Sequence, residues 1–251
     1  MRPLRRGVAR AVIRPPLRLV SSRPHKSSAH ADRRPVHGRG HPAVVRPRLP
    51  RFEPLAVGRV AAPFDHPDWV FEVKYDGLRS LLYAQGGNGE LVSRRGGTYR
   101  RFGGLARSIA YSLRCRSAVV DGELVSVDEQ GRSGCEVVFG NREVPQFYAF
   151  DLLWLDGRDL RHLPMLERRA LLRGIVPGSS PDIVVVQHDV EWGTRLFEFM
   201  TAHDLEGMVA KLAEAPYGLL NGRTPWVEIR NPIYSRAADR LEHGERARSR
   251  M

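Results

Sequence analysis

Short runs of alternating hydrophobic and polar residues dominate the middle of the chain, and this period of two predicts β-strands. Two of the runs, 79–85 and 90–95, form a predicted hairpin closed by the glycine-rich turn 86–89. In another run, 118–127, the residues Asp121-Gly122-Glu123 interrupt the hydrophobic pattern. The remaining predicted strands cover residues 69–74, 146–155, 183–187, 207–212 and 226–230.

Three segments show the helical spacing of hydrophobic residues instead. In residues 104–114, leucine and isoleucine residues four positions apart fall on one face of a helix. Residues 164–175 begin with a proline, which is favoured in the first turn of a helix, and residues 194–203 form the third predicted helix. Because strands dominate and strands and helices do not alternate regularly, the expected fold class is α+β.

The two ends of the chain differ from its middle in composition. Residues 1–50 are rich in proline, arginine, histidine and serine, and they are expected to form a disordered arm. Residues 51–232 form the predicted folded domain, with order beginning near residues 55–64. Residues 233–251 are expected to be a polar, arginine-rich tail.

The positive charge of the protein is concentrated in the arm. The formal net charge is +12, and residues 1–50, with 13 basic residues and one acid, Asp32, account for all of it. Two interpretations of the arm stay open. It binds phosphate backbones without reading their sequence, or it has no such role and is either a solvated, disordered leader or the result of a start site assigned too far upstream.

Composition also argues against several classes of protein. No stretch approaches the roughly 18 apolar residues of a membrane span, and prolines and arginines break the segment where a signal peptide would lie. Cys115 and Cys135 are the only cysteines and indicate neither a disulfide framework nor a zinc site. The phosphate-binding, dinucleotide-binding and zinc-protease motifs are missing from the sequence. We therefore expect a cytoplasmic protein with no membrane partner.

Lysine is the residue that points most directly to chemistry. Of 40 basic residues only Lys26, Lys74 and Lys211 are lysines, and the other 37 are arginines. An arginine stays protonated in proteins, whereas a lysine amine can lose its proton and act as a nucleophile. Lys74 lies where a predicted strand enters a tight Asp76-Gly77 turn, with Arg79 just beyond it.

The pattern Lys74-x-Asp76-Gly77-x-Arg79 resembles the first motif of the covalent nucleotidyltransferases, which include ATP-dependent DNA ligases, RNA ligases and mRNA capping enzymes. Four further matches follow in the order of that family. They are Ser93-Arg94-Arg95-Gly96, Asp121-Gly122-Glu123, Phe147-Tyr148-Ala149-Phe150-Asp151-Leu152-Leu153 and Glu206-Gly207-Met208-Val209-Ala210-Lys211. The surroundings of these motifs, over about residues 53–230, look like the adenylation domain of bacterial ATP-dependent DNA ligases.

The resemblance implies a fold of two antiparallel β-sheets flanked by helices, with ATP and Mg²⁺ as cofactors and nicked DNA as substrate. It also implies that Lys74 captures AMP and passes it to a 5′-phosphate at the nick. Phe150 would stack on adenine, Glu72 would recognise the adenine edge, and Arg94 would contact DNA or phosphate. The full set implied is Lys74 as nucleophile, Glu72, Arg79, Arg94, Glu123, Phe150, Lys211 and Arg230 around the nucleotide, and Glu123 and Glu206 as metal ligands.

Two departures from the family pattern bear on activity. The fifth motif is typically Trp-x-Lys-x-Lys, and this chain has Trp226-Val227-Glu228-Ile229-Arg230 in its place. Glu228 therefore reverses a charge that normally neutralises nucleotide phosphates, and alternation along a strand places it on the same face as Arg230. Ligases of this kind continue into an OB-fold domain, whereas only 21 residues follow Arg230, so a separate OB-domain or repair protein is an expected partner.

Alternative functions stay open at this stage. One is an RNA ligase or capping-type nucleotidyltransferase of the same superfamily. Another is a catalytically impaired ligase remnant that acts as a nucleic-acid-binding module, which the charge of Glu228 favours.

Overall fold

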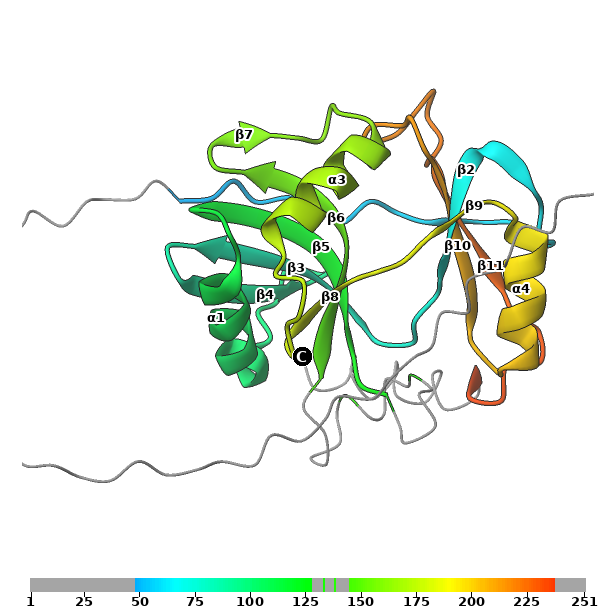
Figure 1. The fold of residues 1–251 in the computed structure, drawn as a ribbon, viewed down its shortest axis with the longest axis horizontal. Helices are drawn as coiled ribbons and strands as arrows, with labels where there is room; N and C mark the ends of the chain where they lie inside the picture. The colour runs from blue at the N-terminus through cyan, green and yellow to red at the C-terminus, as the bar shows by residue number, and fades with distance from the viewer. Residues whose placement is uncertain (1–47, 128–132, 134–137, 139–144, 238–251) are drawn as a thin grey trace, which may run out of the picture. The chain divides into compact units, whose positions relative to one another are not determined.

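The computed structural model describes residues 48–127, 133, 138 and 145–237, which belong to one compact unit. In this unit two β-sheets lie side by side, with helices packed against them (Figure 1). Most of the predicted arm and tail, residues 1–47 and 238–251, lies outside the described residues. The proposed domain boundaries therefore stay a prediction.

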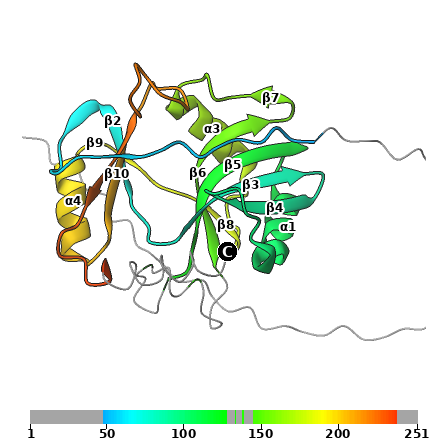
Figure 2. The ribbon, with the colours of Figure 1, turned by 180° about the vertical axis from the view of Figure 1, so that it is seen from behind.

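One sheet has five strands and is mostly antiparallel. Helix α4 (Gly193–Ala202) covers its outer face (Figure 2). Met200 of that helix is buried against Phe71 and Met208 of the sheet. In spatial order the strands are β1 (Gly58–Arg59), β11 (Trp226–Arg230), β10 (Gly207–Leu212), β2 (His66–Val73) and β9 (Asp189–Glu191).

The second sheet has six strands, and its outer face carries the largest hydrophobic core. Helices α1 (Gly103–Ser112) and α3 (Met165–Ile175) pack on this sheet, and the short 3₁₀ helix η1 (Arg100–Phe102) leads into α1. Its strands are β4 (Asn88–Ser93), β3 (Leu78–Gln85), β5 (Ser117–Val125), β6 (Gln146–Leu155) and β7 (Arg158–Asp159), with β8 (Ile183–Val185) parallel to β6.

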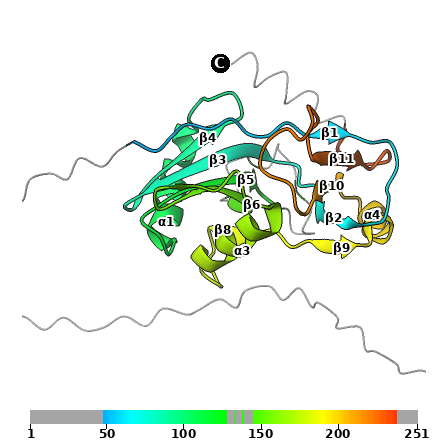
Figure 3. The same ribbon diagram turned by 90° about the horizontal axis from the view of Figure 1, so that it is seen from above.

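A second hydrophobic cluster joins the inner sides of the two sheets. Leu81 and Leu153 of the six-stranded sheet pack in one cluster with Trp226 of the five-stranded sheet. The segment that leads to β1 passes over both sheets (Figure 3). Along this path, the backbone nitrogen of Leu55 donates a hydrogen bond of 2.7 Å to the hydroxyl oxygen of Tyr217. The sheets are thus held together around a shared interior space.

The α+β class with two mostly antiparallel sheets is confirmed. Asp121-Gly122-Glu123 interrupts the hydrophobic pattern of residues 118–127 but not the strand, because β5 runs through Gly122 without a break. The pairing with β6 shifts register there, and a Cβ on Gly122 would lie 2.4 Å from Phe147. The region described contains no helix long and apolar enough to cross a membrane.

The expected tight turn at Asp76-Gly77 is also wrong. Strands β2 and β3 belong to different sheets, so residues 74–77 form a crossover from one sheet to the other. Gly77 is needed for a close approach, since a Cβ there would lie 2.3 Å from the carbonyl oxygen of Leu124. The crossover places Lys74 at the junction of the two sheets.

Candidate active site

Lys74 is the first residue of the crossover, immediately after β2 ends at Val73. Its backbone nitrogen donates a 2.9 Å hydrogen bond to the carbonyl oxygen of Gly207 at the start of β10. Its side-chain nitrogen Nζ lies 3.3 Å from Oε1 of Glu206, a carboxylate that is almost fully buried. The two lysine-motif segments predicted from the sequence, around residues 74 and 206, therefore meet directly.

The register of the five-stranded sheet brings the other motif residues of this sheet to one face. Val209 lies opposite both Glu72 and Glu228, and Lys211 lies opposite Trp226. Residues directly opposite each other in antiparallel strands share a face, and so do residues two apart along a strand. Glu72, Lys211, Trp226 and Glu228 consequently point to the same side of the sheet.

These side chains line a cavity of about 70 Å³. Six of the predicted site residues border it, together with Glu228. The lining consists of Val57, Glu72, Val73, Lys74, Tyr75, Arg79, Glu123, Phe150, Val209, Lys211, Trp226 and Glu228. Both sheets and the segment before β1 contribute to it, so the cavity is a product of the tertiary fold.

Three of the predicted residues stand outside this lining. Glu206 contacts Lys74 from beside the cavity, and Arg230 contacts Glu228 through its Nε at 2.8 Å. Arg94 is exposed just after β4 ends at Ser93. The geometry thus connects Glu206 and Arg230 to the cavity through one intervening residue each, and it does not place Arg94 there.

Two cations lie over the aromatic wall of the cavity. Nζ of Lys211 is 4.3 Å from the ring centre of Phe150 and 4.2 Å from that of Trp226. The guanidinium carbon of Arg79 is 5.1 Å and 5.4 Å from the same two ring centres. Cations over aromatic faces are attracted electrostatically. This part of the cavity therefore combines flat apolar surface with positive charge, which suits a base and its phosphates.

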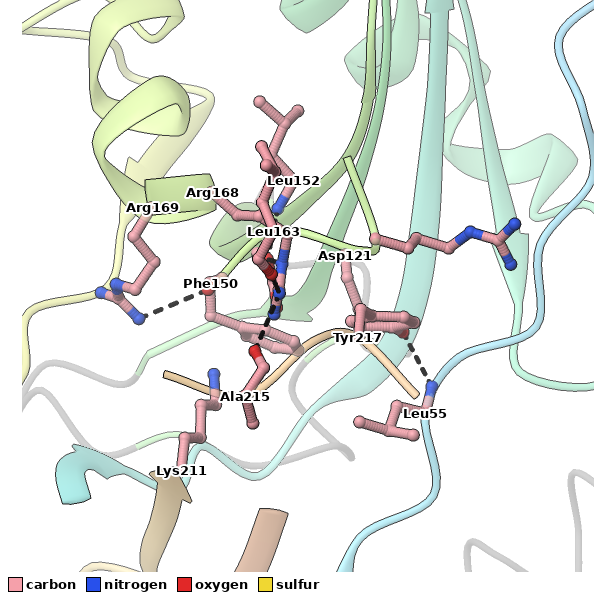
Figure 4. Close-up of polar contacts among 12 residues, drawn as sticks. Leu55, Asp121, Phe150, Leu152, Leu163, Arg168, Arg169, Lys211, Ala215 and Tyr217 are labelled. Carbon is pink, nitrogen blue, oxygen red and sulfur yellow. Dashed lines mark hydrogen bonds and ion pairs between the residues drawn. The ribbon is translucent and has the colours of Figure 1, made fainter. Parts of the chain in front are cut away.

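Glu72 is buried and held by two cations. Nζ of Lys211 lies 2.7 Å from its Oε2, and Arg169, which reaches across from α3, pairs with its Oε1. Arg169 also donates hydrogen bonds to the backbone carbonyls of Phe150 (Figure 4) and Val186. Burial, aided by the charge of Arg169, lowers the pKa of Lys211, although Glu72 opposes that effect. Both oxygens of Glu72 are thus engaged within the protein.

The surroundings of Glu123 disfavour the charged form of its carboxyl group. Burial raises its pKa to about 7, and the neighbouring acids Glu206 and Asp76 act in the same direction, against the charges of Lys74 and Arg79. A carboxylate placed among other acids resists ionisation, and a bound divalent cation would relieve that resistance.

Glu228 faces the cavity, and its two oxygens contact three cations. Oε2 lies 3.8 Å from Nζ of Lys74, while Oε1 lies 2.9 Å from Nη2 of Arg59 and 2.8 Å from Nε of Arg230. Burial works to raise the pKa of Glu228, but these ion pairs outweigh it and lower the pKa. Glu228 and Arg230 are therefore on one face, as the alternation along the strand predicts.

Two buried ion pairs lie next to the site, and the sequence did not predict them. Arg79 donates to both oxygens of Asp121, at 2.9 and 2.7 Å, and Arg168 does the same with Asp151, at 2.8 and 2.7 Å. Tyr217, which contacts Asp121 at 2.6 Å, also receives the hydrogen bond from Leu55 (Figure 4). An aspartate in the middle of a predicted buried strand was the available signal, because such a charge needs a partner.

A lysine amine beside acidic and basic side chains and an aromatic wall, between two mostly antiparallel sheets, fits a nucleotidyltransferase domain. The match to known proteins makes this class specific. A model of the ATP dependent DNA ligase domain matches residues 55–228, and the chain belongs to this family.

The chain is also similar in sequence to proteins that are named as DNA ligases or end-joining proteins. The multifunctional non-homologous end joining protein LigD of Mycolicibacterium smegmatis is 30% identical over 184 residues, which are 69% of this chain and 23% of that protein. DNA ligase C of Mycobacterium tuberculosis is 30% identical over 190 residues, 68% of this chain and 52% of that protein. The chain therefore spans less than a quarter of the length of the LigD relative.

Solved structures agree. The ligase domain of Mycobacterium tuberculosis LigD is 28% identical and has a TM-score of 0.61, over 71% of this chain and 59% of that one. A mycobacterial DNA ligase D complexed with ATP and MES is also 28% identical, with a TM-score of 0.60 over 71% of this chain and 60% of that one. The resemblance to ATP-dependent DNA ligases inferred from the motifs is confirmed.

Proposed function

We propose that this chain is an adenylating DNA ligase domain in which Lys74 forms a covalent lysyl-AMP. The observation that carries the proposal is the position of Lys74, 3.3 Å from Glu206, in a cavity that Phe150, Arg79 and Glu123 also line. The ATP complex of the related mycobacterial ligase D supports ATP as the nucleotide. The RNA ligase alternative has no comparable observation in its favour, and the charge of Glu228, which favours the remnant, is offset by its ion pairs with Arg59 and Arg230.

The chemistry requires an uncharged amine. Glu206 offers Lys74 the nearest carboxylate oxygen for its proton, at 3.3 Å. The amine then attacks the α-phosphorus of ATP, so that an N–P bond forms, the bond to the pyrophosphate oxygen breaks, and pyrophosphate leaves. Arg79 and Lys211, which lie over the aromatic wall, would offer positive charge to the bound nucleotide. The AMP then passes to a 5′-phosphate at a DNA nick, and a 3′-hydroxyl displaces it.

The acidic residues fit a Mg²⁺ ion that arrives with the nucleotide. Within the described ranges no group of three or more His, Cys, Asp or Glu side chains could hold a metal on its own. Mg²⁺ commonly takes only one or two carboxylates and completes its shell with water and phosphate oxygens, and Glu123 and Glu206 can supply that pair. When bound, the ion would offset negative charge on the phosphoryl oxygens.

Incubation with α-labelled ATP and Mg²⁺, followed by denaturing electrophoresis, tests the proposal. We expect a labelled band for the wild type and for Lys26→Arg, and none for Lys74→Arg, which keeps the charge but cannot lose its proton. A wild-type protein that stays unlabelled would contradict the proposed function.

The DNA substrate is tested separately. The end-joining relatives favour a role in DNA repair, and a nicked duplex is the proposed substrate of the labelled protein. Transfer of label from the protein to the 5′-phosphate strand supports it, whereas transfer only to RNA would redirect the proposal. Addition of an OB-fold or repair protein in the same assay tests for the expected partner.

A further inference from the structure

The fifth motif of this chain differs from its family in a way that a neighbouring strand compensates. Strand β1 pairs with β11 in parallel, and the register places Arg59 beside Glu228. Arg59 donates to Oε1 of Glu228 from Nε at 3.2 Å and from Nη2 at 2.9 Å. Arg230 donates to the same oxygen at 2.8 Å. One carboxylate oxygen thus holds two guanidinium groups together.

The charges show why this contact matters for a phosphate-binding site. Glu228 and Arg230 cancel each other on β11, whereas two lysines on that strand would give two positive charges. Arg59 restores a net positive charge to the group. The other oxygen of Glu228 lies 3.8 Å from Nζ of Lys74, so this group of charges adjoins the predicted nucleophile.

Arg59 is also accessible to a ligand. Its side chain is 62% exposed, whereas that of Glu228 is 14% exposed. A guanidinium has five N–H donors in a planar fork that suits phosphate oxygens, and the contacts to Glu228 use only Nε and Nη2. Donors on Arg59 are therefore available to an incoming anion while Glu228 stays in place.

We infer that Arg59 is a second cation, beside Arg230, that binds the phosphates of the nucleotide. From β1 it supplies the charge that the family pattern carries on β11, and with Arg230 it binds the β- and γ-phosphates of ATP. Glu228 positions the two guanidiniums beside Lys74. This inference deepens the proposed function, on which it rests.

The test is a binding cycle with α,β-methylene ATP, which cannot be cleaved between its α- and β-phosphates. Calorimetry compares the wild type, Arg59→Gln, Glu228→Gln and the double variant, with AMP as a second ligand. The matched control is Arg195→Gln, an exposed arginine on α4 at the outer face of the same sheet. Unchanged thermal unfolding of each variant confirms that it is folded.

We expect Arg59→Gln to weaken binding of the ATP analogue about tenfold, the value of one charge-assisted hydrogen bond, and to leave AMP binding unchanged. A measurable part of this loss should remain in the Glu228→Gln background, because the glutamine side chain keeps an oxygen that can accept from Arg59. If Arg59→Gln has no effect in that background, Arg59 only neutralises Glu228 and the inference is wrong. Equal loss of AMP and ATP-analogue binding would also overturn it.

The outcome is separable from that of the proposed function. Normal labelling of Lys74 together with unchanged analogue binding by Arg59→Gln would refute the inference alone. Absence of labelling would refute the proposed function, and the binding cycle would still decide the role of Arg59.

Discussion

Glu123 should make the stability of the folded domain fall as pH rises through the weakly acidic range. Its pKa is raised from the ordinary value of 4.5 to about 7, first by burial and then by Glu206 and Asp76. Between these two values the unfolded chain releases the proton while the folded protein retains it. Folding then requires proton uptake, so higher pH opposes folding.

The magnitude follows from the pKa difference. A tenfold change in proton affinity corresponds to about 1.4 kcal/mol, so the raised pKa amounts to an upper limit of about 3 kcal/mol. Glu123 borders a cavity, and solvent in that cavity reduces the effect. We therefore expect about 1–3 kcal/mol.

The perturbation is Glu123→Gln, which keeps the shape of the side chain and removes its titration. Denaturant unfolding of both proteins is compared at about pH 4.5 and about pH 8. The variant should gain about 1–3 kcal/mol relative to the wild type between the two conditions. Glu198→Gln, which changes an exposed carboxylate on α4, serves as the control. A difference that is independent of pH, or that favours the wild type at high pH, would refute the reasoning.

Three further substitutions probe the support of the site. Arg168→Met leaves the fully buried Asp151 without its partner, and denaturant unfolding should show a loss of about 3–5 kcal/mol; a loss near zero would contradict this. Gly77→Ala sets a Cβ 2.3 Å from the carbonyl oxygen of Leu124, so we expect about 1–3 kcal/mol of destabilisation and weaker labelling, whereas wild-type behaviour would show that the crossover adapts freely. Phe150→Leu should weaken ATP-analogue binding by about 1–3 kcal/mol in calorimetry, and unchanged affinity would remove the stacking role.

Local patterns predicted the elements that carry the site. The strand expected at 146–155 has the same bounds as β6, and the motif segments around Lys74 and Glu206 are adjacent in the fold. Short motifs work here because each is a characteristic run of residues in or next to a strand, as with Lys74 directly after β2 and Glu206 directly before β10.

The ion pairs between residues far apart in the chain could not be predicted from the sequence. Arg59 and Glu228 are 169 residues apart, and Arg169 and Glu72 are 97 apart, so no local pattern connects them. Strand β1 has only two residues, which is too short for any periodicity to show. The Asp76-Gly77 sequence favours a turn, and only the assignment of β2 and β3 to different sheets reveals a crossover.

The central claim is that one amine between the two sheets becomes bonded to a nucleotide. Tandem mass spectrometry of the protein after incubation with ATP and Mg²⁺ tests it most directly, since the chain offers only Lys26, Lys74 and Lys211 as lysines. The account predicts an adenylyl group on the peptide that contains Lys74, attached to that side chain. An adduct on either of the other lysines, or a folded protein that carries none, would contradict it.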